Sequence, residues 1–175
     1  MQKQPHPPRK GQGMSELKMG IGETDEWYTP REIFDALNVH FDLDPCSSGK
    51  DRVPAANKYT KDMSGLDRPW DGMVWMNPPF GGRNGHVPWL RKFVYHGNGI
   101  GLCRAYTSAE WFHVWMPHMD GLLFPRGKTK FIKADGTVGK SPSSGIVIFS
   151  KGKQATEILS NCGTKLGMFF EVKEC

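Results

Sequence analysis

The chain has 175 residues, of which 38% are hydrophobic and 23% charged, and its formal net charge is +5 at pH 7. This length suits one domain with a sizeable core, no apolar run approaches membrane-spanning length, and no apolar stretch follows the N-terminal basic residues. The cysteines, Cys46, Cys103, Cys162 and Cys175, have the spacing of neither a zinc site nor a disulfide framework. We therefore expect an intracellular, cytoplasmic protein without a structural metal or a membrane partner.

The first residues differ in composition from the rest of the chain. Residues 1–24 are rich in Pro, Gly, Lys and Gln, and residues 1–22 carry four basic side chains against one acidic side chain. We predict a flexible basic arm over residues 1–24 and one folded domain over residues 25–175. The charge of the arm permits a polyanionic partner without requiring one.

The folded part is predicted to begin with a helix. Thr29 suits an N-cap, Pro30 suits the first helical position, and Glu32 completes a capping box. The apolar residues that follow share one helical face: Ile33, Phe34 and Leu37.

Short apolar strands then alternate with helical patterns. The predicted strands cover residues 41–44, 73–76, 100–103, 122–124, 130–132, 146–149 and 168–172. The predicted helices cover residues 87–95, residues 109–116 and a segment through Ala155, Ile158 and Leu159. This alternation is typical of an α/β fold with a mixed, mostly parallel sheet. Because no helix separates the strands at 130–132 and 146–149, we expect a late antiparallel hairpin around residues 133–144.

The most informative motif, Asn77-Pro78-Pro79-Phe80, directly follows the strand at 73–76. Two prolines cannot extend the strand, and the carboxyl ends of strands are where ligands bind in open α/β sheets. A rigid turn there presents the Asn77 side-chain oxygen and the Pro78 carbonyl as neighbouring acceptors for an NH2 group. Phe80 offers a flat surface on which a base could stack. The alternative interpretation is a strand-ending turn with two prolines.

A second turn follows the strand at 41–44. Asp44, Pro45 and Cys46 precede small residues, which allow the backbone or ribose of a cofactor to approach closely. The same pattern is also ordinary turn chemistry. The glycine fingerprint of dinucleotide-binding folds is absent from the sequence, so a nicotinamide enzyme is not supported.

These motifs occur in a collinear order that resembles one family. The segments concerned are residues 25–30, 41–44, 57–60, 70, 75–80, 104–108, 111–112, 130–131 and 144–149. Together they resemble the phage-type DNA N-6-adenine methyltransferases (Dam-like), over roughly residues 25–150. The resemblance implies a Rossmann-like S-adenosylmethionine-dependent methyltransferase fold.

The resemblance also implies the site residues. The catalytic residues would be Asn77, Pro78, Pro79 and Phe80, acting on the N6 atom of an adenine flipped out of the duplex. The residues that bind S-adenosylmethionine would be Thr29, Pro30, Asp44, Pro45, Cys46, Asp62 and Asn77. The usual family pattern has glycines after the cysteine, whereas this chain has Ser47-Ser48-Gly49. No histidine is expected to act as a base.

DNA is the expected partner. A basic segment contains Arg126, Lys128, Lys130, Lys133 and Lys140 with Asp135 as its one acidic residue. Such side chains meet phosphates without reading sequence. The alternative interpretation of this segment is a solvated basic hairpin.

Two other functions are compatible with the same residues. An Asn-Pro-Pro-aromatic turn can also present its acceptors to a protein glutamine amide, and a non-catalytic DNA-binding protein could keep the fold. No segment is long enough for a separate target-recognition domain, so we expect a short target site. A phage-encoded enzyme would act in the host cytoplasm, in restriction-modification evasion or in regulation.

Overall fold

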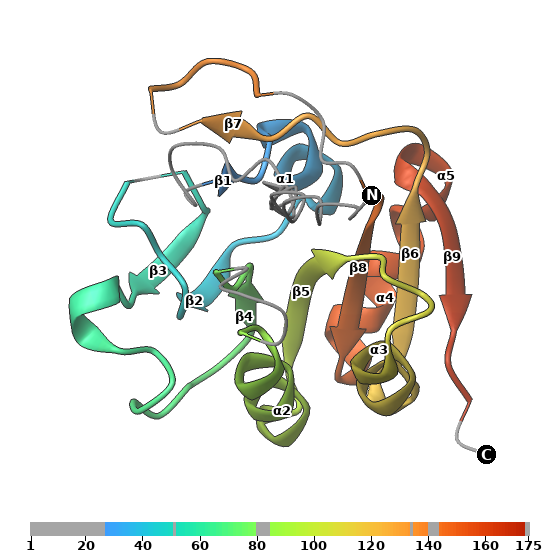
Figure 1. Cartoon of the computed structure of the whole chain (residues 1–175), viewed down its shortest axis with the longest axis horizontal. Helices are drawn as coiled ribbons and strands as arrows, with labels where there is room; N and C mark the ends of the chain where they lie inside the picture. The colour runs from blue at the N-terminus through green and yellow to red at the C-terminus, as the bar shows by residue number, and fades with distance from the viewer. Residues whose placement is uncertain (1–26, 51, 80–84, 134, 140–143, 174–175) are drawn as a thin grey trace, which may run out of the picture.

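The computed structural model describes residues 27–50, 52–79, 85–133, 135–139 and 144–173. The predicted arm over residues 1–24 lies outside the described residues, as do the predicted site residues Phe80 and Lys140. In the part described, the chain forms a seven-stranded mixed sheet, a separate two-stranded sheet, and helices on both faces of the larger sheet (Figure 1).

The strands are β1 (Trp27–Tyr28), β2 (Phe41–Asp44), β3 (Ala55–Lys58), β4 (Val74–Met76), β5 (Gly99–Arg104), β6 (Gly121–Pro125), β7 (Ile132–Lys133), β8 (Ile146–Lys151) and β9 (Gly167–Glu171). The α-helices are α1 (Arg31–Leu37), α2 (Val87–His96), α3 (Glu110–Trp115), α4 (Lys153–Asn161) and α5 (Gly163–Leu166), and the 3-10 helices are η1 (Lys61–Met63) and η2 (Met116–His118). The large sheet has the order β3-β2-β4-β5-β8-β6-β9. None of the helices in these ranges is long and apolar enough to cross a membrane.

Two apolar clusters hold the layers together. On one face of the sheet, Phe34 from α1 and Leu159 from α4 pack in a cluster with Trp75 from β4. On the other face, Phe93 from α2 packs in a cluster with Met76 from β4, together with residues of α3. The central strands are therefore buried on both sides, which explains why their sequences are apolar runs rather than alternating patterns.

Most of the predicted elements are confirmed. The predicted strands at 41–44, 73–76, 100–103, 122–124, 146–149 and 168–172 correspond to β2, β4, β5, β6, β8 and β9. The predicted helices beyond α1 correspond to α2, α3 and α4. The α/β class predicted from this alternation is confirmed as well.

The predicted mixed sheet is confirmed, but the prediction that it is mostly parallel holds for only half of its described strand pairs. The strands β3, β2, β4 and β5 pair in parallel, whereas the pairs β5–β8, β8–β6 and β6–β9 are antiparallel. The residues described between β6 and β8 include no helix that would carry the chain back across the sheet, and β8 runs antiparallel to β6. The sheet consequently has a parallel half and an antiparallel half.

The predicted late hairpin is also wrong, because β7 does not pair with β8. It pairs instead with β1, with Lys133 opposite Trp27 and Ile132 opposite Tyr28. β8 lies between β5 and β6, and its residues 146–150 are all buried. Both edges of β8 are therefore occupied, and no edge remains for β7.

The predicted N-cap of the first helix is wrong as well. Pro30 is the N-cap of α1, with extended backbone angles and without a side-chain cap hydrogen bond, so no capping box forms. The Thr29 hydroxyl accepts a hydrogen bond from the side chain of Asn77 at 3.3 Å instead. This long-range contact takes the hydroxyl away from the helix.

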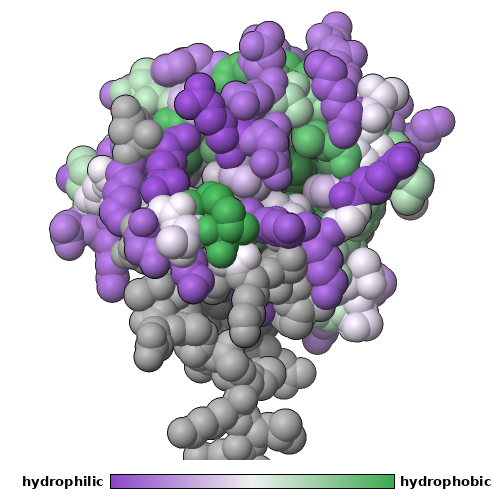
Figure 2. Space-filling model, turned by 90° about the horizontal axis from the view of Figure 1, so that it is seen from above, coloured by the Kyte–Doolittle hydropathy of each residue, from purple (hydrophilic) through white to green (hydrophobic). Residues whose placement is uncertain are grey.

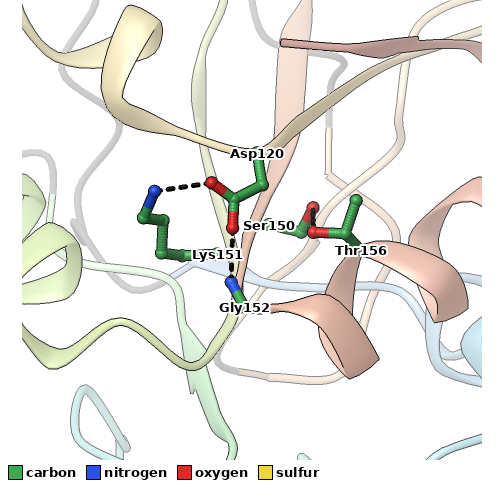
Figure 3. A network of polar contacts seen from close by, with 5 residues as sticks. All are labelled: Asp120, Ser150, Lys151, Gly152 and Thr156. Atoms are coloured by element: carbon green, nitrogen blue, oxygen red, sulfur yellow. Dashed lines mark hydrogen bonds and ion pairs between the residues drawn. The ribbon is translucent and has the colours of Figure 1, made fainter. Parts of the chain in front are cut away.

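A polar network joins the start of β6 to the end of β8 (Figure 3). The carboxylate of Asp120 accepts hydrogen bonds from Lys151 Nζ at 2.5 Å and from the backbone N–H of Gly152 at 2.7 Å. The hydroxyls of Ser150 and Thr156 bond to each other at 3.0 Å. Because β8 runs antiparallel to β5, this network lies at the sheet edge opposite the carboxyl end of β5.

We expect Asp120→Ala to lower the free energy of unfolding by about 1.5–3 kcal/mol, because it leaves an ammonium group and a backbone N–H without their acceptor. The matched control is Asp35→Ala, which breaks the exposed ion pair between Arg31 and Asp35 at 3.5 Å. That control should lower the free energy of unfolding by no more than about 0.5 kcal/mol. Urea unfolding of both variants measures the difference, and equal losses would contradict the assigned role of Asp120.

Candidate functional site

The carboxyl ends of three parallel strands lie at the same edge of the sheet. β4 pairs with β2 through Val74 and Leu43, and with β5 through Met76 and Gly101. The residues that end or follow these strands are Asp44 on β2, Asn77 after β4 and Arg104 on β5. Ligands bind at such an edge in open α/β sheets. The structure thus places the two turns singled out in the sequence next to each other.

Hydrogen bonds fix the turn after β2. The Asp44 carboxylate accepts the backbone N–H of Cys46 at 3.0 Å, and the Asp44 carbonyl accepts the N–H of Tyr59 at 2.9 Å. The N–H of Ser47 donates to the Tyr59 carbonyl at 3.0 Å, and the Ser47 hydroxyl accepts the N–H of Gly49 at 3.1 Å. The turn over residues 44–49 is therefore held against the end of β3.

Burial controls the protonation of Asp44 and Cys46. Asp44 is 3% exposed, and burial raises the pKa of its carboxyl to about 6, although the Cys46 N–H and the charge of Lys58 act in the opposite direction. Burial, followed by the negative charge of Asp44, raises the pKa of the Cys46 thiol, so the thiol is uncharged. The ionised form of Asp44 gains from any positive charge brought beside it.

We expect the folded state to lose stability as the pH rises from about 4 to about 6, because folding raises the pKa of Asp44 from 3.8 to about 6. Below this window the carboxyl is protonated in both states, and above it the folded state carries the full cost of a buried charge, about 3 kcal/mol. Asp44→Asn keeps the acceptor oxygen and removes the titration, so its stability should lack this pH dependence. Urea unfolding of both proteins at pH 4, 5, 6 and 7 measures the effect, and parallel curves would contradict it.

Asn77 is fixed by the loop before α1. Its Nδ2 donates to the hydroxyl oxygen of Thr29 at 3.3 Å, and Thr29 is buried. This hydrogen bond turns the side-chain oxygen Oδ1 away from Thr29, and that oxygen is buried too. Pro78 is buried and Pro79 is exposed. The amide is thus oriented with its oxygen as the acceptor, while the joint action of this oxygen and the Pro78 carbonyl stays a prediction.

A segment that sequence reasoning missed supports the turn after β2. Gly65 approaches the backbone of Pro45 so closely that a Cβ there would lie 2.0 Å from the Pro45 carbonyl oxygen. Lys92 on α2 donates from Nζ to the carbonyls of Gly65 at 3.1 Å and Leu66 at 2.7 Å, and Trp70 Nε1 donates to the Gly65 carbonyl at 2.8 Å. The helix α2 thereby holds residues 65–70 against the turn.

The remaining predicted cofactor residues also lie near this edge. Thr29 and Pro30 precede α1 and are buried, and Pro45 is buried in the turn after β2. Asp62 lies on η1, after the carboxyl end of β3, and is exposed. Their contacts with a cofactor stay predictions.

The predicted DNA-binding residues within the described ranges are all exposed: Arg126, Lys128, Lys130 and Lys133. They lie on the segment that leaves β6 and enters β7, on the side of the molecule toward which β6 points (Figure 1). The surface on this side is mainly hydrophilic, with separate hydrophobic patches (Figure 2). The arrangement is compatible with a polyanionic partner.

Two further basic residues beside this segment were missed from the sequence. The guanidinium of Arg52 lies 4.8 Å, and Lys50 Nζ 5.4 Å, from the ring centroid of Tyr28 on β1. Arg52 also lies next to the turn after β7, because a Cβ on Gly136 would be 3.7 Å from its Nη2. The pairing of β1 with β7 brings Lys50 and Arg52 beside this segment, and no pattern in the sequence predicts that pairing.

A mixed sheet between two helical layers, with polar turns at the carboxyl ends of its parallel strands, is the architecture of α/β domains that bind ligands at that edge. In the described ranges no group of three or more His, Cys, Asp or Glu side chains is placed to hold a metal ion. The chain belongs to the DNA N-6-adenine-methyltransferase (Dam) family, whose model matches residues 17–165. The resemblance predicted from the sequence is confirmed. No curated protein and no solved structure matches the chain.

Proposed function

We propose that this protein transfers the methyl group of S-adenosylmethionine to N6 of adenine in DNA, on a Rossmann-like methyltransferase fold. Family membership supports the reaction class. The observation that carries the proposal is the hydrogen bond between Asn77 and Thr29, which orients the Asn77 amide beside the Asp44 turn. An oriented amide acceptor next to a buried carboxylate suits an NH2 substrate and a cationic methyl donor.

The residues at this edge fit such a donor. Positive charge near Asp44 stabilises its carboxylate, which otherwise has a raised pKa because it is buried. When bound, S-adenosylmethionine supplies a methyl group on a positively charged sulfonium. The residues that we propose to hold it are Thr29, Pro30, Asp44, Pro45, Cys46, Asp62 and Asn77.

Asn77 and Pro78 act on the acceptor nitrogen. N6 of adenine is a poor nucleophile because its lone pair is delocalised into the ring. Hydrogen bonds from N6 to the Asn77 oxygen and the Pro78 carbonyl favour a tetrahedral nitrogen with a localised lone pair. That lone pair forms the N–CH3 bond as the S–CH3 bond breaks, the electron pair of the broken bond stays on sulfur, and N6 releases one proton. Positioning and electrostatics lower the activation barrier, so no strong base is required.

The basic segment holds the DNA at this edge of the sheet. Arg126, Lys128, Lys130, Lys133 and Lys140 contact phosphates. The target adenine leaves the stack and packs against Phe80, at a cost of about a few kcal/mol.

The test uses the full-length protein, methyl-labelled S-adenosylmethionine and unmethylated duplex DNA, followed by nucleoside analysis. The expected product is labelled N6-methyladenine, and label in another nucleoside would overturn the proposal. Label in protein would favour a glutamine amide as the acceptor. Calorimetry with S-adenosylmethionine distinguishes the methyltransferase from a non-catalytic DNA-binding protein. A protein that binds DNA but not S-adenosylmethionine would be the non-catalytic one.

A further inference from the structure

A second polar cluster lies at the same edge of the sheet, on the other side of Asn77 from the Asp44 turn. β4 lies between β2 and β5 in the sheet, and β5 ends at Arg104. Arg104 Nη1 donates to the hydroxyl of Tyr106 at 2.8 Å, and its Cζ lies 5.8 Å from the Tyr106 ring centroid. Tyr106 is 39% exposed, so part of its ring is accessible for stacking.

An uncharged histidine lies beside Arg104. His86 is 7% exposed, and burial, followed by the positive charge of Arg104, lowers its pKa. The imidazole is therefore neutral at neutral pH and adds no positive charge to that of Arg104. The hydrogen bond from Arg104 also lowers the pKa of Tyr106, which shows that the positive charge acts on both neighbours.

The histidine has unused hydrogen-bonding capacity. Its ring packs edge-on against Trp111, with 4.2 Å between the centroids and 79° between the planes. Its Nε2 is buried and has no hydrogen-bond partner in the part of the chain that the structure describes. A buried polar atom in this state is costly unless a ligand or an ordered water completes its bonding.

We propose that Arg104 and Tyr106, beside the buried His86, bind the DNA strand that carries the target adenine, with Arg104 on a phosphate and the Tyr106 ring against a base. The inference rests on the proposed function and adds the substrate side of the same site. The order of the strands supports it, because the Asp44 turn and Arg104 lie on opposite sides of Asn77. A guanidinium binds phosphate with two parallel hydrogen bonds, and an accessible aromatic ring accepts a base that has lost its stacking neighbour.

The test measures binding of a fluorescently labelled duplex of mixed sequence by anisotropy over a series of salt concentrations. Arg104→Met should weaken binding and reduce the slope of log affinity against log salt by about one phosphate contact. Tyr106→Ala should weaken binding about tenfold. Tyr106→Phe keeps the ring and should bind closer to the wild type than Tyr106→Ala does.

The chain offers a matched control in Arg91 and Tyr95 on α2, where the guanidinium also lies 5.8 Å from the ring centroid. Tyr95 lies near the end of α2 that leads into the amino end of β5, and Arg91 lies one helical turn before it, so Arg91→Met and Tyr95→Ala should bind as the wild type does. An unchanged salt slope in Arg104→Met, or equal losses in the Arg91 and Arg104 variants, would overturn the inference even if the wild type methylates DNA. A wild type that binds DNA without methylating it would overturn the proposed function, while the Arg104 slope would still decide the inference. A wild type that does not bind DNA would overturn both.

Discussion

Replacing Asn77 with alanine is expected to abolish methyl transfer while leaving S-adenosylmethionine binding measurable. The substitution removes the oriented acceptor for N6, an interaction that matters most as the nitrogen becomes tetrahedral. Loss of one such preorganised group costs roughly 10²–10³ in turnover. The labelled-methyl assay measures the rate, and calorimetry measures the cofactor. Wild-type turnover in Asn77→Ala would refute the mechanism.

Thr29 provides the matched comparison for Asn77. The Thr29 hydroxyl accepts a hydrogen bond from the Asn77 amide nitrogen at 3.3 Å. Thr29→Val should therefore loosen the orientation of the Asn77 amide without removing the Asn77 oxygen. A hydrogen bond of this kind is worth about 1 kcal/mol, which corresponds to a loss of about fivefold in turnover. Thr29→Ser keeps the hydroxyl and should restore most of the rate. Wild-type turnover in Thr29→Val together with a loss in Thr29→Ser would mean that the methyl group of Thr29, rather than its hydroxyl, positions Asn77.

Gly65→Ala is expected to lower the stability of the fold strongly. The added Cβ would lie 2.0 Å from the Pro45 carbonyl oxygen and 3.2 Å from the Trp89 ring. The nearer atom belongs to the backbone and cannot rotate away, so either residues 65–70 or the turn after β2 must move. We expect a loss of more than about 4 kcal/mol, or a protein that no longer binds S-adenosylmethionine if the turn yields instead.

The control for this substitution is Gly145→Ala. Among the residues that the structure describes, a Cβ at Gly145 would meet only the Ala105 side chain at 4.0 Å, and the backbone of Gly145 does not adopt a positive φ. The change in free energy of unfolding should therefore stay within about 0.5 kcal/mol. Thermal or urea unfolding compares the two variants, and a Gly65→Ala protein as stable as Gly145→Ala would show that the contact with Pro45 is not close in solution.

Sequence reasoning succeeded where burial dictates the residue type. The strands at 73–76 and 146–149 are apolar runs because helices cover both of their faces, and a run of that kind is visible without any knowledge of its partners. The two turns of the candidate site were found for the same reason, since each directly follows a recognisable strand. Asp44 and Asn77 were therefore named as site residues before their strands were known to be neighbours.

The missed features depend on partners that are distant in sequence. β3 consists of Ala55-Ala56-Asn57-Lys58, which is neither an apolar run nor an alternating pattern, and only its pairing with β2 makes it a strand. Lys92 has nothing in its sequence context that predicts its bonds to the carbonyls of residues 65 and 66. The direction and place of β8 follow from how the chain returns to the sheet, which no local pattern encodes.

The place of β8 also determines when the antiparallel half of the sheet can form during synthesis. In the described part of the chain, β6 pairs with β8 and β9, and both follow it in sequence. A growing chain that has reached β6 already contains every strand of the parallel half, but of the strands described it holds neither β8 nor β9, with which the backbone of β6 pairs. Pairings between segments far apart in sequence are slow to close. The second half of the sheet can therefore form on the ribosome only after β8 and β9 have emerged.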